Sequence, residues 1–223
     1  EDRLGPERAC AQGWISPRAM RNGIIVTVLF ACLIGSALLF YAGWELTIVG
    51  LLCVLFAFLY TTGPYPLSYN GWGDVLVIVF FGFVPVGGTY YVQALTWTSD
   101  TTVASLICGL LIDTLLVVNN YRDREADARS GKRTVIVRFG EKFGRYLYLM
   151  LGVAASLLCF WFFFEGHLFA ALLPLLYLIP HVLTWRRMVQ IHSGKKLNSI
   201  LGETSRNMLL MGILLSIGFL IRH

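Results

Sequence analysis

Asp123 and Asp127 lie four positions apart, directly after an apolar stretch of the chain. On a helix that turns about 100° per residue, these two residues and Asn120 lie within roughly 60° of one another, so their oxygens share one face. Two carboxylates with an amide oxygen beside them are hard donors, which Mg²⁺ accepts while it keeps waters and phosphate oxygens in its other positions. The spacing therefore indicates a divalent cation site.

Cationic and amide side chains surround this pair in the sequence. Lys132 and Arg133 follow closely, and Asn119 stands just before Asn120. Arginine and lysine bind phosphate oxygens and would take the charge that a metal leaves unneutralised, so the set suits a diphosphate. The alternative is a solvated, salt-bridged loop, which is the usual meaning of a charged run. The membrane context described next favours the site.

The composition indicates a membrane protein. Of the 223 residues, 57% are hydrophobic and 14% are charged, whereas about a quarter of the residues of a soluble domain are charged. We therefore expect an all-α, polytopic transmembrane bundle surrounded by the lipid bilayer, with no nucleic-acid partner. The five cysteines are scattered singly and predict packing residues, not disulfides or a metal site.

Seven apolar segments are each long enough to cross a hydrocarbon core about 30 Å thick. The acidic pair directly follows the fourth of these segments, so the end of that span positions it. The predicted spans are residues 23–43, 45–61, 74–95, 101–120, 145–164, 168–186 and 204–221.

The basic residues orient these spans, since lysine and arginine in short loops stay on the cytoplasmic side. Seventeen of the 18 basic residues lie in or beside three segments: residues 1–22, the loop after the fourth span, and the loop after the sixth. Only Arg222 lies at the opposite end. We therefore expect the acidic pair on the cytoplasmic face of the plasma (inner) membrane.

Two further features carry candidate chemistry. The loop 60–74 is rich in glycine, proline and tyrosine, and Tyr60, Tyr65 and Tyr69 could contact an aromatic substrate or belong to an interfacial aromatic belt. Asp113 is an acid within the fourth span, two turns before Asn120 and on the same face. Intramembrane acids are functional candidates; the alternative is a hydrogen bond to a neighbouring helix.

Three stretches of the chain carry a family resemblance. NNYRDREADARSGKRTVIVRFG resembles the second aspartate-rich motif of the UbiA superfamily of intramembrane prenyltransferases. DRLGPERACAQGWISPRAM resembles the segment after the first such motif, and YTTGPYPLSYNGWGD resembles the central cytoplasmic loop. The resemblance covers essentially the whole chain. Within the superfamily, NNYRD and GKRT are most similar to the members that prenylate 1,4-dihydroxy-2-naphthoate in menaquinone synthesis.

The resemblance implies a fold of nine transmembrane helices around a central cavity. The seven spans would be helices three to nine of one UbiA-type domain over residues 1–223. The first aspartate-rich motif is then expected just upstream of Glu1, so the chain is expected to be a fragment that is inactive alone.

The resemblance also implies the chemistry. Mg²⁺ held by Asp123, Asp127 and Asn120 would bridge the diphosphate of a polyprenyl donor. The aromatic acceptor would attack the allylic cation and lose CO₂, giving demethylmenaquinone. Together, the residue patterns and the resemblance give these candidate roles: Asp113 in catalysis, and Arg3, Arg8, Asn119, Asn120, Lys132, Arg133, Tyr60, Tyr65 and Tyr69 in substrate binding.

Other functions stay open on the sequence alone. A sibling prenyltransferase with another acceptor, such as 4-hydroxybenzoate, would share the metal site. A cation-coupled transporter would explain an intramembrane acid, although we find no internal repeat of the kind such proteins show. A non-catalytic membrane scaffold is a further alternative, but it would not explain the acidic pair. The prenyl chain length and the oligomeric state are not indicated.

Overall fold

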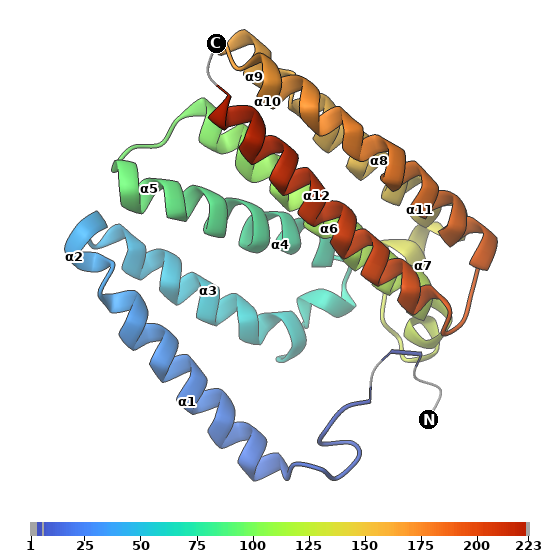
Figure 1. Ribbon diagram of the computed structural model, residues 1–223. Helices are drawn as coiled ribbons and strands as arrows, with labels where there is room; N and C mark the ends of the chain where they lie inside the picture. Colours follow the sequence, from blue (N-terminus) through green and yellow to red (C-terminus); the bar gives the residue numbers. More distant parts are fainter. Residues whose placement is uncertain (1–3, 6, 222–223) are drawn as a thin grey trace.

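The computed structural model describes residues 4, 5 and 7–221, and no strand occurs among them (Figure 1). In chain order the helices are α1 (Pro17–Ser36), α2 (Leu39–Ala42), α3 (Glu45–Thr61), the 3-10 helix η1 (Leu67–Tyr69), α4 (Gly73–Val77), the π-helix η2 (Ile78–Gly87), α5 (Gly88–Ala94), α6 (Ser99–Arg129), α7 (Val135–Phe139), α8 (Glu141–Leu158), α9 (Trp161–Phe164), α10 (Leu168–Leu172), the 3-10 helix η3 (Leu173–Tyr177), α11 (Leu178–Ile191) and α12 (Leu197–Leu220).

The predicted all-α membrane bundle is confirmed. Among the described residues, six helical runs are long and apolar enough to cross a membrane. The remaining predicted span, 45–61, is α3, whose 17 residues are at the lower end of the length that crosses a bilayer. The six runs are Pro17–Ala42, Gly73–Ala94, Ser99–Arg129, Glu141–Phe164, Leu168–Ile191 and Leu197–Leu220.

Short polar residues fix where three of the helices begin. The Ser16 hydroxyl accepts from the Ala19 amide at 3.2 Å, and Pro17 follows at the first helical position, where its missing N–H costs nothing. The Thr98 hydroxyl caps α6 in the same way. Thr134 caps α7. The cap at Thr98 starts α6 within two residues of the predicted span at 101, whereas the cap at Ser16 starts α1 six residues before the predicted span at 23.

Helix α6 is the centre of the bundle. It packs against η2, α8 and α12, and it continues nine residues past the predicted end of its span at 120. Two clusters of buried side chains lie along it. The first contains Ile107, Leu111, Ala155, Cys159, Phe162, Ala170, Tyr177, Met211 and Leu215, and the second contains Val117, Val118, Tyr121, Ile136, Tyr148, Leu151, Met188, Leu197 and Ile200.

The two ends of the bundle differ. Figure 1 shows the N-terminal segment, α7 and the α11–α12 connection at one end, and α2, α9 and the last turn of α12 at the other. The acidic C-terminal turns of α6 therefore lie at the end that carries the N-terminal segment. Helices α1 and α3 contain no buried residue, and Leu33 and Ile34 of α1 are 68% and 69% exposed. Such apolar faces suit lipid.

Glycines allow α6 to approach the helix that begins at Gly73. A β-carbon on Gly109 would lie 2.9 Å from the Ile78 carbonyl oxygen, and one on Gly82 would lie 2.7 Å from the Gly109 Cα. Close backbone approach through small residues is how helices associate in lipid, where burial of apolar surface gives little driving force. The segment Ile78–Gly87 is a π-helix that contains Pro85, a residue that cannot donate to an α-helical ladder.

This contact gives a testable expectation for stability. Gly109→Ala would force η2 and α6 apart and should lower the free energy of unfolding by about 1–3 kcal/mol, the usual cost of overpacking. Thermal unfolding of the purified protein in detergent measures the effect.

Gly212→Ala is the matched control, because a β-carbon at Gly212 of α12 meets nothing within 4 Å. Alanine favours a helix over glycine by about 0.5–1 kcal/mol, so this variant should be as stable as the wild type or slightly more stable. Equal stability of the Gly109 and Gly212 variants would contradict the close contact.

Candidate functional site

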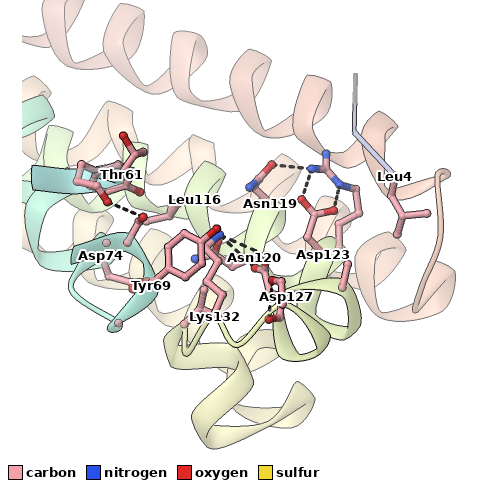
Figure 2. Close-up of a pocket in the computed structure, with 18 of the residues that line it drawn as sticks. Leu4, Thr61, Tyr69, Asp74, Leu116, Asn119, Asn120, Asp123, Asp127 and Lys132 are labelled. Atoms are coloured by element: carbon pink, nitrogen blue, oxygen red, sulfur yellow. Dashed lines mark hydrogen bonds and ion pairs between the residues drawn. The ribbon is translucent and has the colours of Figure 1, made fainter. Parts of the chain in front are cut away.

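A cavity of about 710 Å³ opens at the end of the bundle that carries the N-terminal segment. Its walls come from that segment, the end of α3, the loop 67–73, the start of α4 and the last four turns of α6 (Figure 2). The lining residues are Leu4, Arg8, Tyr60, Thr61, Ser68, Tyr69, Gly71, Gly73, Asp74, Leu116, Asn119, Asn120, Arg122, Asp123, Ala126, Asp127, Arg129, Ser130, Lys132 and Thr134.

One face of α6 supplies the central polar wall. Leu116, Asn120, Asp123 and Asp127 are spaced by three or four residues and all line the cavity, as expected for positions on one helical face. Their backbone belongs to a single α-helix through Arg129, not to a loop. The alternative of a loop is therefore wrong for residues 122–129, which are helical.

Asp123 is held by Arg122. The guanidinium donates to both carboxylate oxygens, with Nε 2.7 Å from Oδ1 and Nη2 2.6 Å from Oδ2. The same guanidinium donates to the side-chain oxygens of Asn119 at 2.7 Å and Asn198 at 2.8 Å. Arg122 is buried, at 4% exposed. A buried cation needs such partners, because its transfer out of water would otherwise cost several kcal/mol.

Asn198 connects this ion pair to the N-terminal segment. It lies in the first turn of α12, and its side-chain nitrogen donates to the Leu4 carbonyl at 2.9 Å. Leu4 and Arg8 both line the cavity. The Asn198 side chain therefore links Arg122, which holds Asp123, to the N-terminal segment that lines the cavity.

Asp127 has its own cation. The Lys132 ammonium lies 3.3 Å from Oδ2 and 3.4 Å from Oδ1. A tight turn brings the lysine back over the helix end: Gly131 has φ +76°, and the Lys132 amide donates to the Asp127 carbonyl at 2.9 Å. The left-handed conformation at Gly131 is one that a residue with a side chain rarely adopts.

The structure brings most of the predicted site residues to this cavity. Arg8, Asn119, Tyr60 and Tyr69 line it, as do Asn120, Asp123, Asp127 and Lys132. Three of the predicted residues are not among the lining residues: Arg133, Tyr65 and Asp113. Arg3 lies outside the described residues.

The main chain explains why Arg133 and Tyr65 point elsewhere. The Arg133 amide donates to the Tyr69 carbonyl at 2.7 Å, which holds the loop 60–74 against the α6–α7 connection and leaves the Arg133 side chain exposed. Arg138 strengthens the same contact by donating to the Asn70 carbonyl at 2.7 Å. Tyr65 lies outside that docked part of the loop and is 56% exposed.

Three cavity or cavity-linked residues were not singled out from the sequence. Asp74 is the one charge in the loop 60–74, which is a signal that could have identified it. Arg122 stands beside Asp123 in the charged run, but nothing in the spacing indicates that it pairs with its neighbour. Asn198 is 76 residues from Arg122, so only the fold shows their contact.

The donors present fit a shared cation site more closely than a complete protein cage. No group of three or more histidine, cysteine, aspartate or glutamate side chains that could hold a metal occurs in the described part of the chain. Two carboxylates and the nearby amides leave several positions of a hard cation for water and ligand oxygens. Cations on the same wall offer charge-assisted hydrogen bonds to an anionic ligand.

Comparisons with known proteins identify the family of this chain. Residues 1–216 match the UbiA prenyltransferase family. A 1,4-dihydroxy-2-naphthoate octaprenyltransferase of Haemophilus influenzae is 37% identical, over 99% of this chain and 74% of that protein. The protein of the same name from Escherichia coli is 38% identical, over 71% of this chain and 53% of that protein. No solved structure matches the chain.

A more distant relative is also named for a naphthoquinone substrate. A 2-carboxy-1,4-naphthoquinone phytyltransferase of Synechocystis is 26% identical, over 56% of this chain and 42% of that protein. The chain thus spans about half the length of most of these relatives. Since the family model matches nearly all of the 223 residues, the chain belongs to the UbiA prenyltransferase family.

Proposed function

We propose that this protein transfers a polyprenyl group from polyprenyl diphosphate to 1,4-dihydroxy-2-naphthoate, in menaquinone biosynthesis. One observation carries the proposal: two acids on one face of α6, each beside a cation, line a cavity at the end of an apolar bundle. Membership of the family supports the reaction class, and the names of the relatives support the naphthoate acceptor.

The proposed cofactor is Mg²⁺, held by Asp123 and Asp127 with Asn120. Carboxylate and amide oxygens are the ligands that this ion prefers, and it keeps waters and substrate phosphates in its other positions. When bound, it supplies a Lewis acid that polarises the diphosphate oxygens and stabilises the leaving group.

The cationic side chains bind the diphosphate in this proposal. Arg122 and Lys132 lie beside the two acids on the cavity wall, and Arg8 of the N-terminal segment lines the same cavity. Arg122 already donates to Asp123, Asn119 and Asn198, so one N–H of Nη1 remains for a phosphate oxygen, while Lys132 acts as a point charge. Fixed cations aimed at the diphosphate stabilise the charge that develops on it as the prenyl C–O bond breaks.

The aromatic acceptor completes the reaction. The ring carbon that bears the carboxyl group attacks the prenyl carbon, and a C–C bond forms between them. CO₂ then leaves, and the electrons of the broken C–C bond return to the ring. The products are diphosphate, CO₂ and the quinol form of demethylmenaquinone. Tyr60, Tyr69 and Leu116 form the wall for this ring. The bundle must exclude water, because water would trap the allylic cation.

We also place this site on the cytoplasmic side of the plasma (inner) membrane. The basic residues gather in the connections at the cavity end, which is the bias expected of cytoplasmic loops. The prenyl tail would leave the cavity between apolar helices toward lipid, so a membrane site suits a long isoprenoid donor.

The acceptor can be tested directly in membranes that contain the protein. With labelled polyprenyl diphosphate and Mg²⁺, we expect product from 1,4-dihydroxy-2-naphthoate and none from 4-hydroxybenzoate. Product from 4-hydroxybenzoate alone would replace the naphthoate as acceptor. Ion transport by the purified protein without any prenyl transfer would reject the enzyme altogether.

The acidic pair can be tested by isosteric substitution. Asp123→Asn and Asp127→Asn should each lower kcat/KM by at least about 100-fold, which is the scale for losing one electrostatic contact to a transition state. Labelled prenyl transfer over a range of Mg²⁺ concentrations measures this loss.

Glu125→Gln is the control for the acidic pair, because Glu125 lies on the same helix with its side chain 72% exposed. It should retain wild-type activity. Full Mg²⁺-dependent activity of the Asp123 variant would show that the metal is held elsewhere.

The role of Asn198 gives a milder prediction. Asn198→Ala removes one acceptor of Arg122 and the link to Leu4, so the diphosphate-binding arginine should be less well positioned. We expect KM for polyprenyl diphosphate to rise about fivefold, equivalent to one hydrogen bond of about 1 kcal/mol, with kcat nearly unchanged.

Ser199→Ala is the matched control in the same turn, since the Ser199 hydroxyl donates only to the Lys196 carbonyl. It should leave both kinetic constants unchanged. An unaltered KM in Asn198→Ala, or an equal rise in the Ser199 variant, would argue against the link.

A further inference from the structure

Two carboxylate oxygens near the inner end of the cavity lack a hydrogen-bond partner. They are Oδ1 of Asp74 and Oδ1 of Asp113, and both atoms are buried. Asp113 as a whole is 1% exposed. A buried acceptor without a donor costs about 1–3 kcal/mol, so a native structure that keeps two of them needs a reason.

The two acids lie on helices that meet beside Tyr60. A β-carbon on Gly73 would lie 3.3 Å from Leu116 Cδ2 and 3.4 Å from the Tyr60 hydroxyl, so α3, α4 and α6 converge there. Asp74 is the next residue and lines the cavity, near Leu116 in Figure 2. Asp113 is three residues before Leu116 on α6, on the same face and one turn deeper.

The three polar side chains belong to the place where these helices meet. Asp74 follows Gly73, which lies against the Tyr60 hydroxyl and Leu116, and Asp113 is one turn before Leu116 on α6. Asp113 and Leu116 precede Asn120 on α6, whereas Arg122 and Lys132 follow it. The acids Asp74 and Asp113 are therefore at the inner end of the cavity, away from these two cations. An inner end that offers acceptor oxygens needs a ligand with a hydrogen to donate.

We infer that Asp74, with Tyr60 beside it and Asp113 behind it, forms a subsite for a ring hydroxyl of the aromatic acceptor; this rests on the proposed function. Asp74 meets the hydroxyl directly because it lines the cavity, and Asp113, which does not line it, lies behind Asp74 one turn deeper on α6. A hydroxyl that donates to a carboxylate makes a charge-assisted hydrogen bond. That bond would also enrich the ring in electrons and so favour its attack on the prenyl carbon.

The subsite would select hydroxylated rings. A site built to hydrogen-bond a substrate hydroxyl rejects the analogue that lacks it, because its buried polar groups are then left unpaired. Simple naphthoates separate this selection from catalysis: 1-hydroxy-2-naphthoate carries the hydroxyl, and 2-naphthoate does not.

The test is a binding titration of the two naphthoates with the purified protein in detergent, without a prenyl donor. Tryptophan fluorescence reports binding, since Trp72 stands two residues from Asp74. We expect wild-type protein to bind 1-hydroxy-2-naphthoate at least about tenfold more tightly than 2-naphthoate. In Asp74→Ala the two affinities should agree to within about twofold.

A second variant separates ligand binding from a structural role. Asp113→Leu removes an unpartnered carboxyl from the interior, so it should unfold at the same or a higher temperature and also show a reduced affinity ratio. A structural role predicts a lower unfolding temperature with an unchanged ratio. If the ratio of the two naphthoate affinities is unchanged in both variants, the subsite is rejected. If Asp113→Leu does not fold, the result for Asp74→Ala alone is used.

Ser105→Ala is the matched control. It removes the other unpartnered buried side-chain oxygen on α6, at a position two turns further from the cavity than Asp113. It should keep the wild-type ratio, and a ratio that falls here as well would contradict the assignment.

Turnover distinguishes this inference from the proposed function. In one outcome the wild-type protein prefers the hydroxylated naphthoate, Asp74→Ala loses this preference, and no prenyl transfer to 1,4-dihydroxy-2-naphthoate occurs. This outcome would reject the reaction and keep the hydroxyl site. Normal transfer together with an unchanged ratio in Asp74→Ala would reject the subsite and keep the reaction.

Discussion

The pairing of charges at the end of α6 is the interaction on which the site depends. Arg122 and Asp123 are neighbours in the chain, and their bidentate contact satisfies a nearly buried guanidinium and one carboxylate together. Asp127 and Lys132 form the second pair, across a turn that Gly131 makes possible. Charged groups beside an apolar interior need such partners, because an isolated charge there would cost many kcal/mol. The same pairs leave two acids and two cations on one wall, where the proposed metal-bound diphosphate would bind.

The bundle keeps that wall in place. One continuous helix carries the chain from the membrane interior to Arg129, with buried side chains along both halves of its length. The close contact of Gly82 with Gly109 sets the distance between α6 and the helix that starts at Gly73, and thereby the position of Asp74. The loop 60–74 closes the remaining side through its main-chain contact with Arg133. Cations thus gather at the outer end of the cavity and unpaired acids at the inner end, so the two substrates would bind at chemically different ends.

Much of this arrangement could be predicted from local patterns. Apolar runs predict the membrane helices, and the four-residue spacing of Asp123 and Asp127 predicts their common face. The length of α6 could not be predicted in this way, because the apolar run ends near Asn120 while Arg, Glu and Ala, which favour helices, continue it to Arg129. The contact of Arg122 with Asn198 could not be predicted either, because Asn198 belongs to another helix. Arg133 was expected at the phosphate because of its charge, but its main chain, not its guanidinium, makes the contact with Tyr69.

The most direct measurement is an experimental structure of the protein with Mg²⁺ and an unreactive polyprenyl thiodiphosphate. The account predicts a cation at about 2.0–2.1 Å from carboxylate oxygens of Asp123 and Asp127, which is the usual Mg²⁺–oxygen distance. It also predicts diphosphate oxygens in contact with Arg122 and Lys132. A cation bound away from these two acids, or a diphosphate outside the cavity, would contradict the account.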